Sequence, residues 1–162
     1  LPPGSVLIDW VKASGGKTYA IGKIGDIFSM RNIDYNFTGT DRDLMDHLRK
    51  QIDSAEDGSL IFANFVEFDS LFGHRRDPTG YAKALEWFDN EIASVVRNLL
   101  EDDLLIITAD HGNDPTWSGT DHTREQVPIL IKGKADLIQS GIEFGDVAKL
   151  ASKHLGLAIP EP

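Results

Sequence analysis

The sequence predicts an α/β fold: a mostly parallel sheet with helices on both faces, in a single domain over residues 1–162. Two observations support this. Short apolar runs bounded by turn residues alternate with segments whose apolar residues recur every three or four positions. No linker, internal repeat or low-complexity tract interrupts the series, and the expected order is helix, strand, helix, strand, helix, strand, strand, helix.

Turn and capping residues set the expected boundaries in the first half of the chain. Gly15-Gly16 is typical of a helix end, and Thr40 with Asp43 resembles a capping pair at a helix start. The segment 30–39 is mostly polar and is expected to be irregular. The elements expected here are a helix over residues 5–13, a strand over 18–21, a helix over 40–52 and a strand over 60–66.

A long helix and two strands are expected in the second half. Pro78 with Thr79 predicts a helix start, because proline is favoured at the first helical position. Pro128 is tolerable near the start of a strand or at a sheet edge. The elements expected here are a helix over residues 78–100, strands over 104–107 and 127–131, and a closing helix over 145–155.

Composition excludes several classes of protein. The net charge of −10 argues against a nucleic-acid partner, since binders of nucleic acid carry a basic face. Apolar runs are far shorter than a membrane span and no signal peptide is visible, so no membrane partner is expected. The absence of cysteine excludes thiolate ligands and is compatible with the cytoplasm, which is the expected location.

Possible metal ligands follow the predicted strand over residues 104–107. Asp110 and His111 come directly after it, Gly112 allows a turn, and His122 lies eleven residues beyond His111. Open α/β sheets place their chemistry just past the carboxyl ends of strands. A carboxylate with imidazoles suits Zn²⁺, Mn²⁺ or Fe better than Ca²⁺ or Mg²⁺ alone. The alternative interpretation is a polar loop in which the aspartate caps a turn.

A second carboxylate and histidine follow the predicted strand over residues 60–66. Asp69 comes first, and His74 lies five residues further on. Two such sets at neighbouring strand ends could hold two metal ions about 3.5–4 Å apart, the geometry that clamps both oxygens in a phosphoryl transfer. His47 and His154 lie in helical patterns and are expected to be structural or solvent-facing.

Three stretches resemble the phosphopentomutase family of the alkaline phosphatase-like superfamily, in the right order and over nearly the whole chain. They are Gly-Lys-Ile-Gly-Asp-Ile-Phe (22–28), Phe-Asp-Ser-Leu-Phe-Gly-His-Arg-Arg-Asp (68–77) and Thr-Ala-Asp-His-Gly-Asn-Asp-Pro-Thr-Trp-Ser-Gly-Thr-Asp-His-Thr-Arg-Glu (108–125). The resemblance implies a phosphomutase that interconverts ribose or deoxyribose 1-phosphate and 5-phosphate. A phosphorylated pentose would then be its partner, in nucleotide metabolism.

The resemblance also implies site residues. Asp69, His74 and His122 would bind one Mn²⁺, and Asp110 with His111 the other; Zn²⁺ or Mg²⁺ are the alternatives. Lys23, which follows the first strand, matches a lysine that helps to hold the phosphorylated sugar, although a solvated loop lysine is an equal alternative. Further candidate contacts to the substrate are Arg75, Arg76 and Arg124, with salt bridges to Asp77 or Glu125 as the alternative.

The chain departs from the family in length. Family members are more than twice as long, and this chain resembles only the C-terminal part of their metal-binding core. The segment with the threonine nucleophile and the cap domain have no counterpart here. We therefore expect the isolated chain to be inactive and an exposed sheet edge to favour self-association. Alternatives are another enzyme of the superfamily, such as a cofactor-independent phosphoglycerate mutase or a phosphodiesterase, or a non-catalytic protein for binding or assembly.

Overall fold

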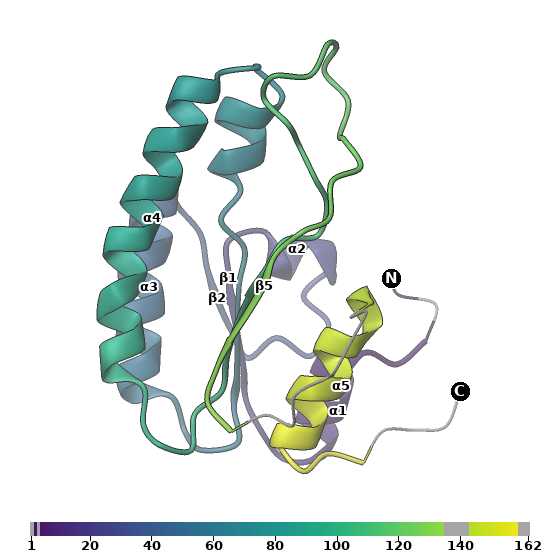
Figure 1. Cartoon of the computed structure of the whole chain (residues 1–162). Coiled ribbons are helices and arrows are strands. Elements are labelled where there is room, and N and C mark those ends of the chain that lie inside the picture. Colours follow the sequence, from purple (N-terminus) through teal and green to yellow (C-terminus); the bar gives the residue numbers. More distant parts are fainter. Residues whose placement is uncertain (1, 3, 135–142, 159–162) are drawn as a thin grey trace.

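Short strands lie between two layers of helices in the computed structural model, which describes residues 2, 4–134 and 143–158 (Figure 1). The helices α3 and α4 cover one side of the strands, and α1 and α5 lie on the other. The elements in chain order are α1 (Leu7–Ala13), β1 (Thr18–Ile21), α2 (Ile24–Ile27), β2 (Tyr35–Phe37), α3 (Asp41–Ser54), β3 (Leu60–Ala63), the π-helix η1 (Phe68–Gly73), α4 (Pro78–Asn98), β4 (Leu105–Thr108), β5 (Ile129–Lys132) and α5 (Phe144–His154). The mixed α/β architecture predicted from the sequence is confirmed.

The strand β1 is the centre of a three-stranded parallel sheet with the order β2-β1-β3. All four of its residues are buried, because it has a neighbouring strand on each edge and helices on each face. Its Ile21 packs with Leu44 and Met45 of α3 and with Val95 of α4. On the opposite face, Ala20 packs with Ile8 of α1 and Ile24 of α2. Each large apolar side chain buried in this way contributes about 1.5–3 kcal/mol.

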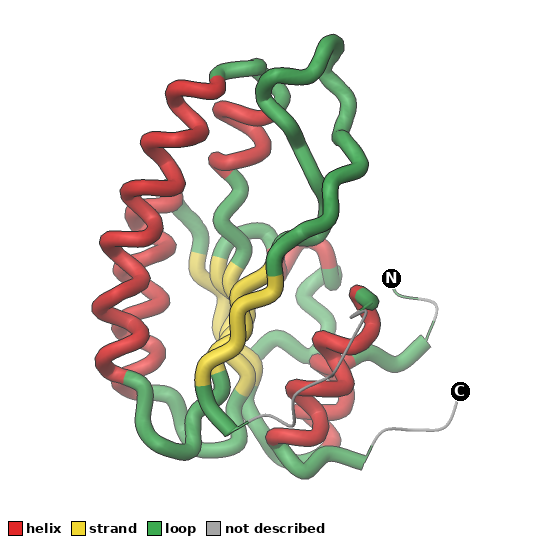
Figure 2. Tube along the Cα trace, in the orientation of Figure 1, coloured by secondary structure: helices red, strands yellow, loops and turns green. Residues whose placement is uncertain are grey.

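The last two strands pair with each other in the antiparallel direction. Leu105 of β4 lies opposite Lys132 of β5, and among the described residues no strand ladder joins this pair to the parallel sheet. No helix stands between the two strands in the chain, and a parallel pairing would need such a crossover. The sequence did not predict this antiparallel pair, which lies beside the parallel sheet: Leu105 and Ile107 of β4 pack against the apolar cluster that contains Ile21 of β1 (Figure 2).

Four local elements differ from the sequence expectations. The segment 30–39 contains a strand, β2, which pairs with β1 and places Tyr35 in a stack on Tyr19 with 4.7 Å between ring centroids. The short helix α2 and the π-helix η1 were not expected either. The strand β3 ends at Ala63 rather than at residue 66, so Asp69 lies on η1 and not at a strand end. For β2 the cause is a tertiary neighbour, since the strand pairs with β1.

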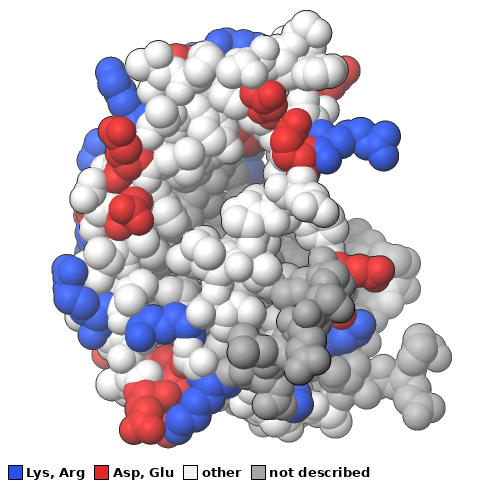
Figure 3. Space-filling model, viewed as in Figure 1, with Lys and Arg blue, Asp and Glu red and all other residues white. Residues whose placement is uncertain are grey.

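The expected helix starts are confirmed in atomic detail. The Thr40 hydroxyl accepts a hydrogen bond from the Asp43 amide, and the Asp43 carboxylate accepts one from the Thr40 amide at 2.9 Å. Pro78 occupies the first turn of α4, where Asp77 caps the amide of Gly80. Within the described residues no helix is long and apolar enough to cross a membrane. On the face in Figure 3, acidic and basic side chains are interspersed.

Asp41, the first residue of α3, is a buried carboxyl group next to a second acid. It is 3% exposed, and its Oδ2 accepts a 3.2 Å hydrogen bond from the amide of Glu67. Its Oδ1 has no hydrogen-bond partner in the described structure. Burial first, and then the nearby charge of Glu67, raise the pKa of Asp41 from 3.8 to about 6. The folded chain therefore holds a proton on Asp41 more tightly than the unfolded chain does.

Asp41→Asn should raise the free energy of unfolding at pH 7 by up to about 3 kcal/mol, since one pKa unit corresponds to about 1.4 kcal/mol. The free energy of unfolding of the wild-type chain falls as the pH rises from 3.8 to about 6, because Asp41 then has to ionise in a buried position. Urea unfolding of both proteins between about pH 4 and pH 7 measures the difference. The gain should shrink towards pH 4, and a gain independent of pH would contradict the assignment.

Candidate metal centre

Two segments, one after β3 and one after β4, meet beyond the ends of these strands. After β3 the chain enters η1, whose wide turn is closed by the 2.9 Å hydrogen bond from the His74 amide to the Asp69 carbonyl. After β4 it forms a long loop, at the upper right in Figure 1, that folds back on itself through a bridge between Gly112 and Thr123. A π-helical turn is rare and often marks a functional site. These two segments carry all five metal ligands predicted from the sequence: Asp69 and His74 follow β3, and Asp110, His111 and His122 follow β4.

Gly112 allows the loop to close. A Cβ atom at this position would lie 2.5 Å from Oε2 of Glu125 and 3.0 Å from its backbone nitrogen. The bridge from Gly112 to Thr123 brings their neighbours His111 and His122 side by side, with stacked rings 3.7 Å apart. The loop thus converts an eleven-residue separation in sequence into a contact between two imidazoles.

One carboxylate and three imidazoles face one another in the resulting cluster. Ligand atoms of Asp69, His111 and His122 all lie within 4.8 Å of one another. The His122 Nε2 lies 3.4 Å from Oδ1 of Asp69, and the His74 Nε2 lies 3.3 Å from Oδ2. The two nitrogens Nε2 of His74 and His122 are 3.2 Å apart. The separation of His74 and His122 is thus short enough for both rings to contact one ion.

This donor set fits a divalent transition-metal ion. Imidazole nitrogen and carboxylate oxygen are the ligands that Zn²⁺, Mn²⁺ and Fe²⁺ take in proteins. The side chains of Asp69, His74 and His122 are 35%, 36% and 48% exposed, so an ion can reach them from solvent. Without a cation between them, imidazole nitrogens this close would have to share a hydrogen, since two lone pairs repel. These residues therefore present the donors that such an ion takes, at a position open to solvent.

The structure does not gather all the predicted residues into this cluster. The Asp110 side chain is 78% exposed and lies 3.7 Å from the Nε2 of the adjacent His111, outside the group of mutually close donors. Lys23 is exposed just past the end of β1, where it precedes α2. Arg75 and Arg124 are exposed. Arg76, in contrast, is hydrogen-bonded to the loop itself.

The sequence interpretation missed one residue that contacts the cluster. Asn113 is 8% exposed, and its Nδ2 donates a 2.6 Å hydrogen bond to Oδ1 of Asp69. Its side-chain oxygen accepts a 2.6 Å hydrogen bond from Nη1 of Arg76. The sequence did offer a sign of this role, because Asn113 directly follows Asp110-His111-Gly112. A buried amide in such a position can orient a metal ligand through a hydrogen bond.

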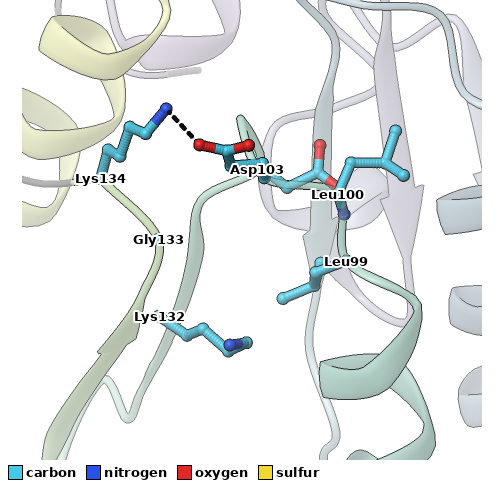
Figure 4. A pocket seen from close by; sticks show the side chains of 7 residues that line it. Leu99, Leu100, Asp103, Lys132, Gly133 and Lys134 are labelled. Carbon is cyan, nitrogen blue, oxygen red and sulfur yellow. Dashed lines mark hydrogen bonds and ion pairs between the residues drawn. The ribbon is translucent and has the colours of Figure 1, made fainter.

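A hollow of about 330 Å³ lies elsewhere, at the opposite end of the β4–β5 pair (Figure 4). Its walls come from the turn between α4 and β4 and from the end of β5, where Lys134 pairs with Glu101 at 3.2 Å. Its lining includes no histidine. This hollow is separate from the metal-ligand cluster, which lies past the other end of β4.

Comparisons with known proteins agree with this geometry. The sequence profile of the metalloenzyme superfamily matches residues 10–159. Phosphopentomutases from Sinorhizobium fredii and Rhizobium rhizogenes are 46% and 47% identical over 98% of the chain. A phosphopentomutase from Chromohalobacter salexigens is 45% identical over 97% of the chain. The chain spans about 40% of the length of each of these relatives.

The profile match covers nearly the whole chain. It runs from α1 to the end of the described residues and includes both segments that carry the cluster. With this match, and with a carboxylate and three imidazoles brought together from two segments, the chain belongs to the metalloenzyme superfamily.

Proposed function

We propose that this chain is the metal-binding part of a phosphopentomutase, an enzyme that interconverts ribose or deoxyribose 1-phosphate and 5-phosphate. The observation that carries the proposal is the cluster of Asp69, His111 and His122, with His74 beside it. All four residues lie in stretches that resemble that family, and the relatives named phosphopentomutase are 45–47% identical to the chain. The metabolism of nucleotides in the cytoplasm is the setting that this activity implies.

The proposed metal sites divide the ligands into two sets. Asp69, His74 and His122 hold one divalent cation, and Asp110 with His111 hold a second. The first set is supported by distances of 3.3 and 3.4 Å between its ring nitrogens and carboxylate oxygens. Mn²⁺ is the proposed ion, with Zn²⁺ or Mg²⁺ as alternatives. When bound, such a pair of cations neutralises charge on a phosphoryl group during its transfer.

Three exposed cationic side chains are proposed to bind the phosphate of the sugar. Lys23, Arg75 and Arg124 are all exposed and therefore free to meet a ligand from solvent. The net charge of −10 would otherwise repel a phosphorylated substrate, so the bound metals and these cations have to reverse the local sign.

Self-association is proposed to use the edge of β2, where Tyr35 and Asn36 are exposed.

The isolated 162-residue chain should not interconvert ribose 1-phosphate and ribose 5-phosphate. The reason is that the family's threonine nucleophile has no counterpart here, and without an acceptor oxygen no phosphoenzyme can form. A chimera in which this chain replaces the corresponding part of the Sinorhizobium fredii relative should interconvert the two ribose phosphates. The assay measures ribose 5-phosphate formation in Mn²⁺, with 3-phosphoglycerate as the control substrate. A folded, metal-loaded chimera that isomerises phosphoglycerate but not the pentose phosphate would contradict the proposal.

A further inference from the structure

We propose that Arg76 and Asn113 are positioning residues for the metal centre. In this role Arg76 fastens the loop over residues 112–123 to η1, and Asn113 orients the carboxylate of Asp69 towards the histidines. The inference deepens the proposed function and rests on it in one respect, namely that Asp69 and His122 are metal ligands. The contacts themselves hold for the chain whatever the reaction.

The guanidinium of Arg76 connects the loop to the end of η1. Its Nη1 donates to the carbonyl oxygen of Asp114 at 2.8 Å and to that of Gly73 at 3.0 Å. Its Nη2 donates to the carbonyl of Asp121 at 2.6 Å, and its Nε donates to the carbonyl of Gly119. One side chain thus holds three points along the loop. The guanidinium suits this role because it spreads five N–H donors over a planar fork, whereas an ammonium has three donors on one nitrogen.

The backbone of Arg76 is unusual in a way that agrees with this role. Its φ angle is +53°, in the left-handed region that side chains with a Cβ rarely adopt. Such a conformation persists where the surrounding contacts overdetermine it, and it is often found at functional sites. At Arg76 the backbone is held by hydrogen bonds from its own amide to the Gly73 carbonyl at 3.1 Å and from the Asp77 amide to the Phe72 carbonyl at 3.0 Å. The side chain is held by the carbonyl oxygens of the loop.

Asn113 links Arg76 to Asp69, and hydrogen-bond chemistry sets its orientation. A guanidinium only donates, so the side-chain oxygen of Asn113 has to face Nη1 of Arg76, 2.6 Å away. The amide nitrogen then faces Oδ1 of Asp69, which accepts at 2.6 Å. The other oxygen of Asp69 faces His74. The two hydrogen bonds of Asn113, one to Arg76 and one to Asp69, therefore determine the orientation of the Asp69 carboxylate.

The same loop also orients His74. The Nδ1 of His74 lies 2.5 Å from the carbonyl oxygen of Thr120. Because a carbonyl oxygen only accepts, Nδ1 carries the hydrogen in this contact, and Nε2 is the ring nitrogen that faces the cluster. A metal-ligating histidine commonly has this arrangement, with its second nitrogen donating to a carbonyl. Docking of the loop by Arg76 thus prepares two ligands at once.

Gly73 leaves the room that Asn113 needs. A Cβ atom at Gly73 would lie 2.5 Å from Nδ2 of Asn113 and 2.7 Å from its Cγ. These contacts are too close for an alanine unless Asn113 moves away from Asp69.

Arg76 differs in its surroundings from the neighbouring Arg75, which is exposed. Most of the donors of Arg76 are engaged by backbone carbonyls and by Asn113. Arg76 therefore has little capacity left for the substrate contact considered from the sequence.

Limited proteolysis of the 162-residue chain tests the docking of the loop without any metal. Trp117 is 60% exposed within the loop, and chymotrypsin can cleave after it. Arg76→Ala should accelerate this cleavage at least about 10-fold, because the loop then opens more often. Arg76→Lys should not rescue it, since an ammonium keeps the charge but lacks the fork. Arg75→Ala is the matched control and should leave the rate unchanged.

Calorimetric titration with Mn²⁺ tests the orientation of Asp69. Asn113→Ala should weaken Mn²⁺ binding about 10- to 100-fold, as is typical when a residue that orients a ligand is lost. It should change cleavage after Trp117 less than about 2-fold, because the contacts of Arg76 to the loop carbonyls remain. A purely structural role of Asn113 would not separate the two measurements in this way. Gly73→Ala, which keeps both side chains, should weaken Mn²⁺ binding in the same direction.

The outcomes separate this inference from the proposed function. If Arg76→Ala and Asn113→Ala behave like Arg75→Ala in both measurements, the positioning role is wrong, while the proposed activity stands. If the wild-type chain binds no Mn²⁺, the metal sites proposed above fail for this chain, and cleavage of the Arg76 variants decides the inference. If circular dichroism shows that Arg76→Ala is unfolded, Asn113→Ala and Gly73→Ala decide it.

Discussion

Asp69→Asn should lower the affinity of the 162-residue chain for Mn²⁺ by at least about 100-fold, the largest effect that we expect from any single substitution on binding. Asp69 is the one carboxylate among the mutually close donors, and its two oxygens lie 3.4 Å from His122 and 3.3 Å from His74. The amide keeps the shape of the side chain but removes the negative charge that offsets the loss of water from the ion.

Isothermal titration with Mn²⁺ measures this affinity, and the unfolding midpoint in urea verifies that the variant is folded. Asp89→Asn is the matched control, because it removes one exposed carboxylate from α4, outside the cluster. An affinity within about 3-fold of the wild-type value would remove Asp69 from the set of ligands. A similar loss in Asp89→Asn would instead attribute the effect to net charge.

His122→Ala should reduce turnover of the chimera with the Sinorhizobium fredii relative by about 1,000-fold or more, with the fold intact. The His122 ring lies against both His74 and His111, so its loss removes the contact between the two proposed metal sites. Because the side chain is 48% exposed, little apolar packing is lost with it. Activity should therefore fall far more than stability.

The measurement is ribose 5-phosphate formation at saturating Mn²⁺, together with the urea unfolding midpoint. His154→Ala, in the last turn of α5, is the control and should keep turnover within about 2-fold of the parent. Retained turnover in His122→Ala would show that the ring is not a ligand. Equal losses in the two variants would indicate a general effect on folding.

Several elements could be predicted from the sequence because their causes are local. Thr40 and Asp43 cap α3 within four residues, and Pro78 begins α4 at the position where its missing amide is harmless. The strand β1 was predicted with its observed bounds, since a short apolar run between glycines has few alternatives. The separation of candidate ligands into two segments was also evident, because Asp and His side chains recur after two apolar runs.

Other elements depend on neighbours that are distant in sequence. Tyr35 lies in a strand because β1 offers its edge and Tyr19 offers its ring, whereas the polar residues around it predict an irregular segment. The antiparallel pairing of β4 with β5 likewise joins residues on either side of the long loop. Propensity is a weak guide to strands for this reason, since what stabilises a strand is the surface on which it packs.

By itself the sequence determined the α/β class, the boundaries of most helices, and the residues able to bind a metal, because these depend on hydrophobic periodicity, capping and side-chain chemistry. Only the tertiary structure decided how those residues meet. It gathers Asp69, His74, His111 and His122 and leaves Asp110 exposed beside them. It also engages Arg76 with loop carbonyls and places Asn113 on Asp69. The physical reason is that a carboxylate, an amide or a guanidinium has many potential partners of equal chemistry, and only the folded backbone determines which of them lies within hydrogen-bond distance.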